Sequence, residues 1–479
     1  MKKLGLLFIS LFLFATAGFA KTNISAIKKY SVDTLYNKLK AKDYEVIQAV
    51  KSKKLNLNKE SMLGYTVLSY AAIDNDLEIV QLLLESGAKP DAGLNFPLYE
   101  ACWAAENVSN RYEVINLLLK YGANINKKHR NTTYTPLMAT IKRQNGYYAQ
   151  YLILKGAKVN LTNGDGETAL MLAIDYKSRR TDSSIIKKLI ESGANVNYIA
   201  KNGNTALSIA CFYADYEVVK MLLENGASTL VTVKNKNEIP VLNACYAGSY
   251  ECVKELLKYG ADINVKDSYG ANAILLSCMS KDSPELISLC ISNGCDVNCV
   301  DPSSGHTPFI LAAIWNHPKQ MEVLYNYGAN TLYENPAIGN TLKYIIANGI
   351  VESEPPFFHA NELGGAIYGI ERRMFHPLGI KNLRPFIIKY LNLSKTPEKQ
   401  EEYKKLLEAT VKESYKGTPA YTIYEAAILN KTDTMNAFVK DSSVFLEQVD
   451  SEGFTALDYA KKYGNPEIEA ILLKAGAKK

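Results

Sequence analysis

The chain has 479 residues, of which 47% are hydrophobic and 22% are charged, and its formal net charge is +6. This charge is small for the length and is spread along the chain, which argues against a nucleic-acid-binding protein. No long apolar run follows the first twenty residues, so no membrane span is predicted beyond them.

The first twenty residues show the three parts of a secretory signal peptide. Two lysines, Lys2 and Lys3, precede the apolar run Leu4–Phe14, and small residues follow it. Cleavage sites of the expected kind end at Ala17 and at Ala20. The alternative is an uncleaved anchor, but a membrane span needs about 20 apolar residues and this run is shorter. We therefore expect a bacterial signal peptide and a mature protein that is periplasmic or secreted.

A pattern of about 34 residues then recurs along the chain, and Gly203–Leu230 shows it most completely. Thr205 offers a hydroxyl at the start of a short helix, where free backbone N–H groups need an acceptor. Gly226 stands where the second helix should end in the left-handed conformation that glycine tolerates best. The apolar stripe of that second helix is formed by Val218, Val219, Leu222 and Leu223. The same closing glycine recurs at Gly87, Gly122, Gly156, Gly193, Gly260, Gly294 and Gly328.

One helix pair of this kind cannot bury its own apolar stripe, so the copies must stack into a solenoid. The copies resemble the ankyrin-repeat family, whose consensus contains Thr-Pro-Leu-His-x-Ala-Ala and later Leu-Leu-Leu-x-x-Gly-Ala. Gly305 opens the sequence GHTPFILAA, and Leu82–Ala88 reads LLLESGA. The resemblance covers 64–332 and returns in 421–479. It implies an all-α ankyrin-repeat solenoid of helix-turn-helix units with short β-hairpin finger loops, which form a concave binding surface with the first helices.

The copies depart from the family consensus in one column and in two loops. The consensus histidine is replaced in each copy, so its usual hydrogen bonds to neighbouring turns should be absent. The repeats also vary in length, which predicts insertions near Ala105–Asn110 and Lys177–Ser183. The residues that we place in the histidine column are Ser69, Tyr99, Met138, Met171, Ser208, Asn243, Leu275, Ile310 and Asp458.

The cap that should precede the repeats contains two amphipathic stretches, Val32–Lys40 and Tyr44–Lys51, which predict two helices. A solenoid needs such a polar end to remain soluble. The predicted organisation is a signal peptide (1–20), an N-terminal helical cap or degenerate repeat (21–63), ankyrin repeats (64–332), a divergent helical insertion or eroded repeats (333–420), and C-terminal ankyrin repeats with a cap (421–479).

The segment 333–420 breaks the repeat register. The paired prolines at 355–356 are incompatible with a helix. Beyond them, Asn361–Phe375 and Lys381–Leu393 resemble a modified first and second helix, and Pro397–Lys416 predicts a strongly charged helix. Two interpretations stay open, namely eroded repeats with an extra exposed helix, or a family-specific docking element.

The eight cysteines offer no metal site of common spacing, and we predict none. The densest group, Cys290, Cys295, Cys299 and His306, lacks the Cys-x-x-Cys opening that zinc sites usually have. Cys295 and Cys299 flank one turn, so a disulfide between them fits an exported protein. The cysteines that replace small or apolar repeat residues should be buried, and they are Cys102, Cys211, Cys245, Cys252, Cys278 and Cys290.

The sequence contains no recognisable catalytic motif, such as a Gly-x-Ser-x-Gly elbow, a His-Glu-x-x-His pair or a phosphate-binding glycine loop. We therefore expect a scaffold that recognises a protein partner without catalysis and without a cofactor. The alternative is an enzyme or a small-ligand site within 333–420, with the repeats as its scaffold. Candidate contact residues lie on the fingers and first helices, and they are Trp103, His129, Arg130, Tyr134, Tyr198, Lys201, Lys234, Lys236, Lys266 and Tyr269.

Overall fold

The computed structural model describes residues 24–104, 111–174, 183–230, 239–315, 317–330 and parts of 333–478. The chain divides into two compact units, Met1–Val231 and Thr232–Lys479, which we describe one at a time. Several expectations fall outside the described residues. These are the signal peptide, the insertions near 105–110 and 177–182, and the helix at 361–375.

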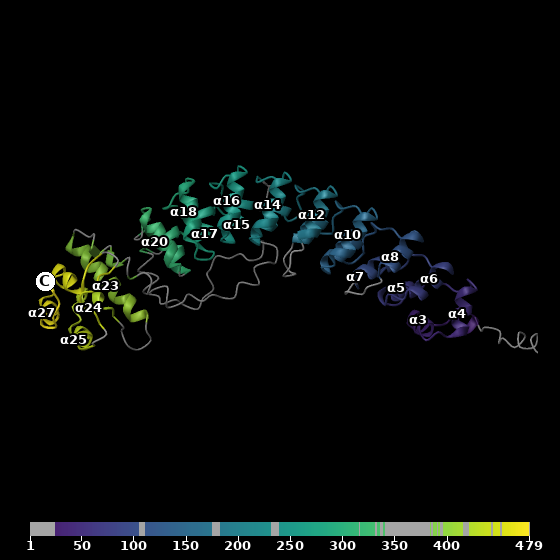
Figure 1. Cartoon of the computed structure of the whole chain (residues 1–479), viewed down its shortest axis with the longest axis horizontal. Helices are drawn as coiled ribbons and strands as arrows, with labels where there is room; N and C mark the ends of the chain where they lie inside the picture. The colour runs from purple at the N-terminus through teal and green to yellow at the C-terminus, as the bar shows by residue number, and fades with distance from the viewer. Residues whose placement is uncertain are drawn as a thin grey trace, which may run out of the picture. The chain divides into compact units, whose positions relative to one another are not determined.

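The first unit consists of short helices that pair along the chain (Figure 1). Helix α5 packs against α7, α7 against α9, and α9 against α11, while the intervening second helices α6 and α8 pack against each other. This stacking of pair upon pair confirms the predicted helical solenoid. The helices are α2 (Ile24–Ile27), α3 (Val32–Lys40), α4 (Tyr44–Lys51), α5 (Val67–Ile73), α6 (Leu77–Glu85), α7 (Pro97–Trp103), α8 (Arg111–Lys120), α9 (Pro136–Lys142), α10 (Gly146–Leu154), α11 (Ala169–Ile174), α12 (Ser183–Glu191), α13 (Ala206–Phe212) and α14 (Tyr216–Glu224).

The second unit repeats this arrangement. First helices α15, α17 and α19 pack in sequence, second helices α16, α18 and α20 do the same, and α24 packs against α26. Two short strands pair antiparallel, with Glu334 opposite Asn340. The elements are α15 (Pro240–Tyr246), α16 (Tyr250–Lys258), α17 (Ala273–Cys278), α18 (Pro284–Ser292), α19 (Pro308–Ile314), α20 (Pro318–Asn326), β1 (Glu334–Asn335), β2 (Gly339–Asn340), α23 (Pro397–Ser414), α24 (Ile423–Ile428), α25 (Thr432–Lys440), α26 (Ala456–Lys462) and α27 (Pro466–Lys474).

The repeat Gly203–Leu230 folds as its residue types predict. The Thr205 hydroxyl accepts a hydrogen bond from the Ser208 N–H, and the Ser208 hydroxyl oxygen accepts one from the Thr205 N–H, which makes a capping box at the start of α13. Gly226 ends α14 with a φ of +81°. The Ala227 N–H donates to the Leu222 carbonyl at 3.0 Å, the bond expected of a glycine-terminated helix. The stripe residues Val218, Val219, Leu222 and Leu223 are all buried.

Replacing Gly226 by valine should lower the free energy of unfolding by more than about 1 kcal/mol, because a β-branched residue is strained at positive φ. A Cβ atom at this position would meet no heavy atom within 4 Å, so the loss reflects backbone conformation and not a clash. Urea unfolding followed by circular dichroism measures it. Gly226→Asn is the matched control and should lose less stability, because asparagine tolerates the left-handed region. An unchanged midpoint for the valine variant would contradict the repeat register.

An asparagine that follows the closing glycine by four residues links successive repeats. Asn160 Oδ1 accepts from the Asn195 N–H at 2.8 Å, and its Nδ2 donates to the Gly193 carbonyl at 2.9 Å. Asn197 binds the next turn in the same way, through Ser228 N–H and the Gly226 carbonyl. These side chains satisfy backbone groups that the ends of the second helices leave free. The regular spacing of these asparagines is a sequence signal for the links between repeats, and the predictions above did not include it.

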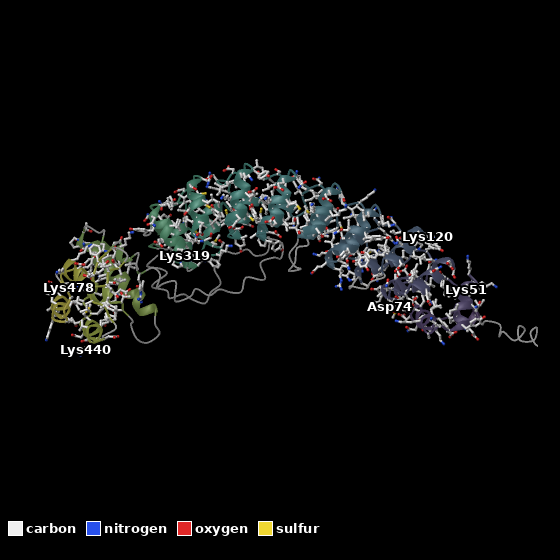
Figure 2. All side chains as sticks on the ribbon, in the orientation of Figure 1. Lys51, Asp74, Lys120, Lys319, Lys440 and Lys478 are labelled. Atoms are coloured by element: carbon white, nitrogen blue, oxygen red, sulfur yellow. The ribbon has the colours of Figure 1, made fainter. Side chains whose placement is uncertain are left out.

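The two helices predicted for the N-terminal cap are present as α3 and α4, with the bounds that the amphipathic pattern gave. The Tyr36 hydroxyl donates to Asp74 Oδ2 at 2.7 Å, and Lys40 Nζ donates to the same oxygen at 2.6 Å (Asp74 is labelled in Figure 2). Asp74 directly follows the last residue of α5. The cap is therefore fixed to the first full repeat by hydrogen bonds as well as by apolar packing.

The predicted charged helix is present as α23, and described residues of the segment before it are also helical. Residues 384–392, where described, are helical and contact the first helices of the last repeats. Arg384 Nη1 lies 3.3 Å from Glu425 Oε2, and the Tyr463 hydroxyl donates to Asn392 Oδ1 at 2.8 Å. The described residues within Lys381–Leu393 are thus helical, in agreement with the predicted helix, while its assignment as a second helix stays a prediction.

Candidate binding surface

The finger loops between repeats are tight turns that backbone hydrogen bonds close. In the first unit the Ser61 N–H donates to the Tyr65 carbonyl, and the His129 N–H donates to the Tyr134 carbonyl, both at 2.8 Å. In the second unit Lys266 and Asn272 form an antiparallel bridge around such a turn. The fingers are thus short hairpins, as the family resemblance implied.

The first two fingers are held together by Asn95. Its backbone N–H donates to the Gly64 carbonyl at 3.1 Å, and its Nδ2 donates to the Leu63 carbonyl at 2.7 Å. Gly93 allows this approach, because a Cβ atom there would lie 2.9 Å from the Gly64 oxygen. Two fingers joined by backbone and side-chain hydrogen bonds form a preorganised surface rather than two independent loops.

His129 extends this network to the third finger from inside the protein. Its Nδ1 accepts from the Thr132 N–H at 3.3 Å, so Nε2 carries the proton and donates to Asn95 Oδ1 at 2.6 Å. The ring stacks on Tyr99 with centroids 4.2 Å apart, and the residue is only 5% exposed. The pKa of His129 is lowered, mainly by burial and secondly by the charge of the nearby Lys127, and this keeps the ring neutral. Our assignment of His129 to an exposed fingertip is therefore wrong.

The loss of the consensus histidine does not remove the hydrogen bonds to neighbouring turns. The Ser69 hydroxyl donates to the Asn95 carbonyl at 2.6 Å, and the Tyr99 hydroxyl lies 2.9 Å from Thr132 Oγ1. Both bonds reach the turn of the following repeat, so the expectation that such bonds would be absent is wrong for these two residues. The column itself also needs one correction. Since α15 begins after Ile239, the residue in the histidine position is Leu242 and not Asn243.

Trp103 lies half-buried at the end of α7, and its surroundings suit a contact residue. Its ring stacks on that of Tyr99 at 5.9 Å with an interplanar angle of 14°. The exposed Arg143 guanidinium lies over the Trp103 ring at 5.7 Å from its centroid. Trp103 and His129 are therefore brought together around Tyr99. Of the remaining candidates, Arg130 and Tyr134 share the finger of His129, and the others lie farther along the chain.

Those remaining candidates differ in how far they reach solvent. Arg130 and Lys201 are exposed, and Lys201 Nζ donates to the Gly164 carbonyl at 2.5 Å, which ties one finger to its neighbour. Tyr134 and Tyr198 are half-buried. In the second unit Lys266 and Tyr269 are exposed, while Lys234 and Lys236 lie outside the described residues.

Two features of this surface were not predicted from the sequence. The first is apolar exposure on the joined fingers, where Met62 is fully exposed, Leu63 is 72% exposed and Leu94 is 40% exposed. The sequence signal for this exposure was the apolar pair Met62 and Leu63 inside an otherwise polar loop. The second is Glu100, an acidic residue on the face of α7 where most other copies carry apolar or aromatic side chains. Glu100 is only 6% exposed.

The predicted disulfide is not formed in the structure, where Cys295 and Cys299 are both free thiols with separate neighbours. Cys295 Sγ lies 4.0 Å from the Ile263 carbonyl oxygen, and Asn272 Nδ2 lies 3.4 Å from Cys299 Sγ. The pKa of the Cys295 thiol is raised, mainly by its contact with Cys290 and secondly by burial. This thiol is therefore a poor nucleophile. The cysteines that we expected to be buried are indeed buried, and they are Cys102, Cys211, Cys245, Cys252, Cys278 and Cys290.

Metal-binding clusters and membrane-spanning helices are both absent from the described residues. These residues contain no group of three or more His, Cys, Asp or Glu side chains arranged to hold a metal ion. Within the same parts of the chain, no helix has both the length and the apolar character that crossing a membrane requires. The segment proposed for an alternative catalytic or ligand-binding role, 333–420, lies largely outside the described residues.

The family model described as "Ankyrin repeats (3 copies)" matches this chain at 35–129, 101–198, 137–235, 178–267 and 241–335, which together exceed half of its length. The chain belongs to the ankyrin-repeat family. Ankyrin repeats serve as scaffolds for protein–protein interaction, and the stacked helix pairs with short finger turns agree with this membership.

Known relatives match parts of this ankyrin-repeat protein. An ankyrin repeat protein of Acanthamoeba polyphaga mimivirus is 27% identical over 42% of this chain and 26% of its own length. An ankyrin repeat protein of Fowlpox virus is 31% identical over 25% of this chain and 28% of its own length. One from Rickettsia felis is 27% identical over 36% of this chain and 50% of its own length. The matches thus span half or less of these curated relatives. The solved human ASB11 ankyrin repeat domain has 23% identity, covers 44% of this chain and 90% of its own, and gives a TM-score of 0.38.

Proposed function

We propose that this protein is a non-catalytic scaffold outside the cytoplasm that holds a protein partner through its fingers and first helices. The observation that carries this proposal is the rigid pair of fingers in the first unit, which Asn95 joins by hydrogen bonds and which expose Met62, Leu63 and Leu94. Exposed apolar side chains on a preorganised surface are typical of protein-binding sites. Among the described residues, no group of three or more His, Cys, Asp or Glu side chains is arranged to hold a catalytic metal ion.

Export is part of this proposal and rests on the composition of the first twenty residues, which follow the order of a secretory leader. Fractionation of the native bacterium, followed by N-terminal sequencing of the protein, tests it. We expect a mature N-terminus after Ala17 or Ala20, in the periplasm or the medium. A cytoplasmic protein that starts at Met1 would contradict export and leave the binding function open.

Charge reversal on the fingers should weaken capture of the partner. The variant Lys201→Glu, Lys234→Glu and Lys266→Glu changes three lysines that the sequence predicts on fingers. We expect a loss of about 5- to 30-fold in apparent affinity, since rim charges each contribute modestly. Cross-linking pull-down from the native envelope with the full chain provides the measurement. The matched control reverses Lys120, Lys187 and Lys254, which are exposed on second helices instead, and it should leave capture unchanged.

Two outcomes of this pull-down would count against the proposed surface. Equal losses for the finger variant and its control would show that only net charge matters. Capture that survives finger reversal and disappears when 333–420 is deleted would move the binding site to the divergent segment.

A further inference from the structure

Glu100 lies on the face of α7 that also carries Trp103, because residues three apart share one face of a helix. Its side chain is nearly buried, with 6% of the residue exposed. Within the described residues, neither a hydrogen-bond donor nor the cation of a salt bridge reaches its carboxyl group. A buried carboxylate normally has such a partner, so Glu100 departs from the usual rule.

The carboxyl oxygens nevertheless remain within reach of solvent. They are absent from the fully occluded, unpartnered side-chain atoms of the described residues, which include Gln320 Oε1 and Thr307 Oγ1. An unpartnered oxygen that is not fully occluded must keep some contact with solvent. The Glu100 carboxyl is therefore not completely sealed from solvent.

Aromatic rings flank this carboxyl from two repeats. Tyr65 lies close enough for the Glu100 charge to raise the pKa of its phenol, second to the effect of burial. The Tyr65 ring stacks on Tyr70 at 5.3 Å, and on the α7 side Tyr99 stacks on Trp103. Faces of tyrosine and tryptophan rings attract cations, so rings beside a carboxylate favour a positively charged ligand.

The cations of the surrounding elements are engaged elsewhere. Lys127 Nζ lies 4.5 Å from the centre of the Phe96 ring, and the Arg143 guanidinium lies over Trp103. His129 stays neutral inside its hydrogen-bond network. Burial alone raises the pKa of Glu100 to about 7, with no contribution from a neighbouring cation. The site therefore lacks the positive charge that its carboxyl group would accept.

We propose that Glu100 and the rings around it form the binding site for a lysine or arginine side chain of the protein partner. The exposed apolar fingertips Met62, Leu63 and Leu94 would contact apolar residues that flank this side chain in the partner. The inference rests on the proposed protein-binding function and specifies the chemistry that the partner must present. The charge of the ligand replaces the missing cation, and its alkyl stem covers the ring faces.

The full chain carrying ¹³C-labelled glutamate provides a direct test with small probes. At pH 7, n-butylammonium and n-butylguanidinium should shift the Glu100 carboxyl signal toward its ionised position. That signal is assigned as the one missing from Glu100→Gln. Sodium chloride at equal concentration and n-butanol should leave it unchanged. An equal response to sodium chloride, or no response to either organic cation, would contradict the proposed cation-binding site.

Capture of the partner provides a second readout. Glu100→Gln should reduce capture at least tenfold at pH 8, whereas Glu113→Gln, an exposed glutamate on α8, should not change it. Glutamine has nearly the shape of glutamate, and hydrogen exchange checks that both variants keep the fold. If finger charge reversal weakens capture and Glu100→Gln does not, the proposed function stands and this inference falls.

Discussion

Glu425→Gln is expected to lower the free energy of unfolding of the second unit by about 3 to 5 kcal/mol. The side chains of Arg384 and Glu425 are 4% and 2% exposed, and Arg384 Nη1 lies 3.4 and 3.3 Å from the two carboxyl oxygens. Glutamine retains the shape of the side chain but not its charge, so a guanidinium would remain buried without its carboxylate. Removal of one member of a buried ion pair is much more costly than removal of both.

Local unfolding is the more direct measurement for this pair, because a long repeat protein need not unfold in one step. Hydrogen exchange of the α24 and α26 amides reports the free energy of opening in this region. The matched control is the double variant Arg384→Met and Glu425→Leu, which replaces both charges by apolar groups of similar size and should recover most of the loss. A change below about 0.5 kcal/mol in the single variant, the range of ordinary surface substitutions, would show that the pair is not a buried one in solution.

The sequence predicted those parts of the fold that depend on neighbouring residues along the chain. Periodic apolar residues located α3 and α4 with their observed bounds, and the glycine column located the ends of the second helices. Thr205 was predicted to start α13, and its hydroxyl caps that helix. In each case the controlling interaction spans five residues or fewer, so the local pattern contains the necessary information.

The candidate surface was predicted less well, because it depends on contacts about one repeat apart. His129 occurs in a polar loop and was expected at the surface, yet Asn95 and Tyr99 of the preceding repeat enclose it. Ser69 was expected to lack the hydrogen bond of a histidine, but the Asn95 carbonyl of the next finger lies within its reach. A family consensus identifies the column of such a residue and not the partner that the neighbouring repeat supplies.

Glu100→Gln should remove a pH dependence that the wild-type protein shows between about pH 4.5 and pH 7. Burial raises the pKa of Glu100 from its ordinary value of 4.5 to about 7, so the native state binds this proton more tightly than the unfolded state does. Stability from this group is therefore fully present below pH 4.5 and is lost as the pH rises to about 7. Allowing for partial solvent screening, we expect the loss to be about 2 to 3 kcal/mol.

Urea unfolding of wild type and Glu100→Gln at pH 5, 6, 7 and 8 isolates this contribution, because the other carboxyl groups titrate equally in both proteins. The advantage of the variant should grow with pH and level off above pH 7, whereas Glu113→Gln should show no such trend. A constant difference would mean that the Glu100 carboxyl is fully hydrated. The same desolvation penalty provides a second test of the proposed cation-binding site. At pH 8, n-butylammonium should stabilise the wild-type protein and leave Glu100→Gln unchanged, since only the ionised carboxylate gains from a bound cation.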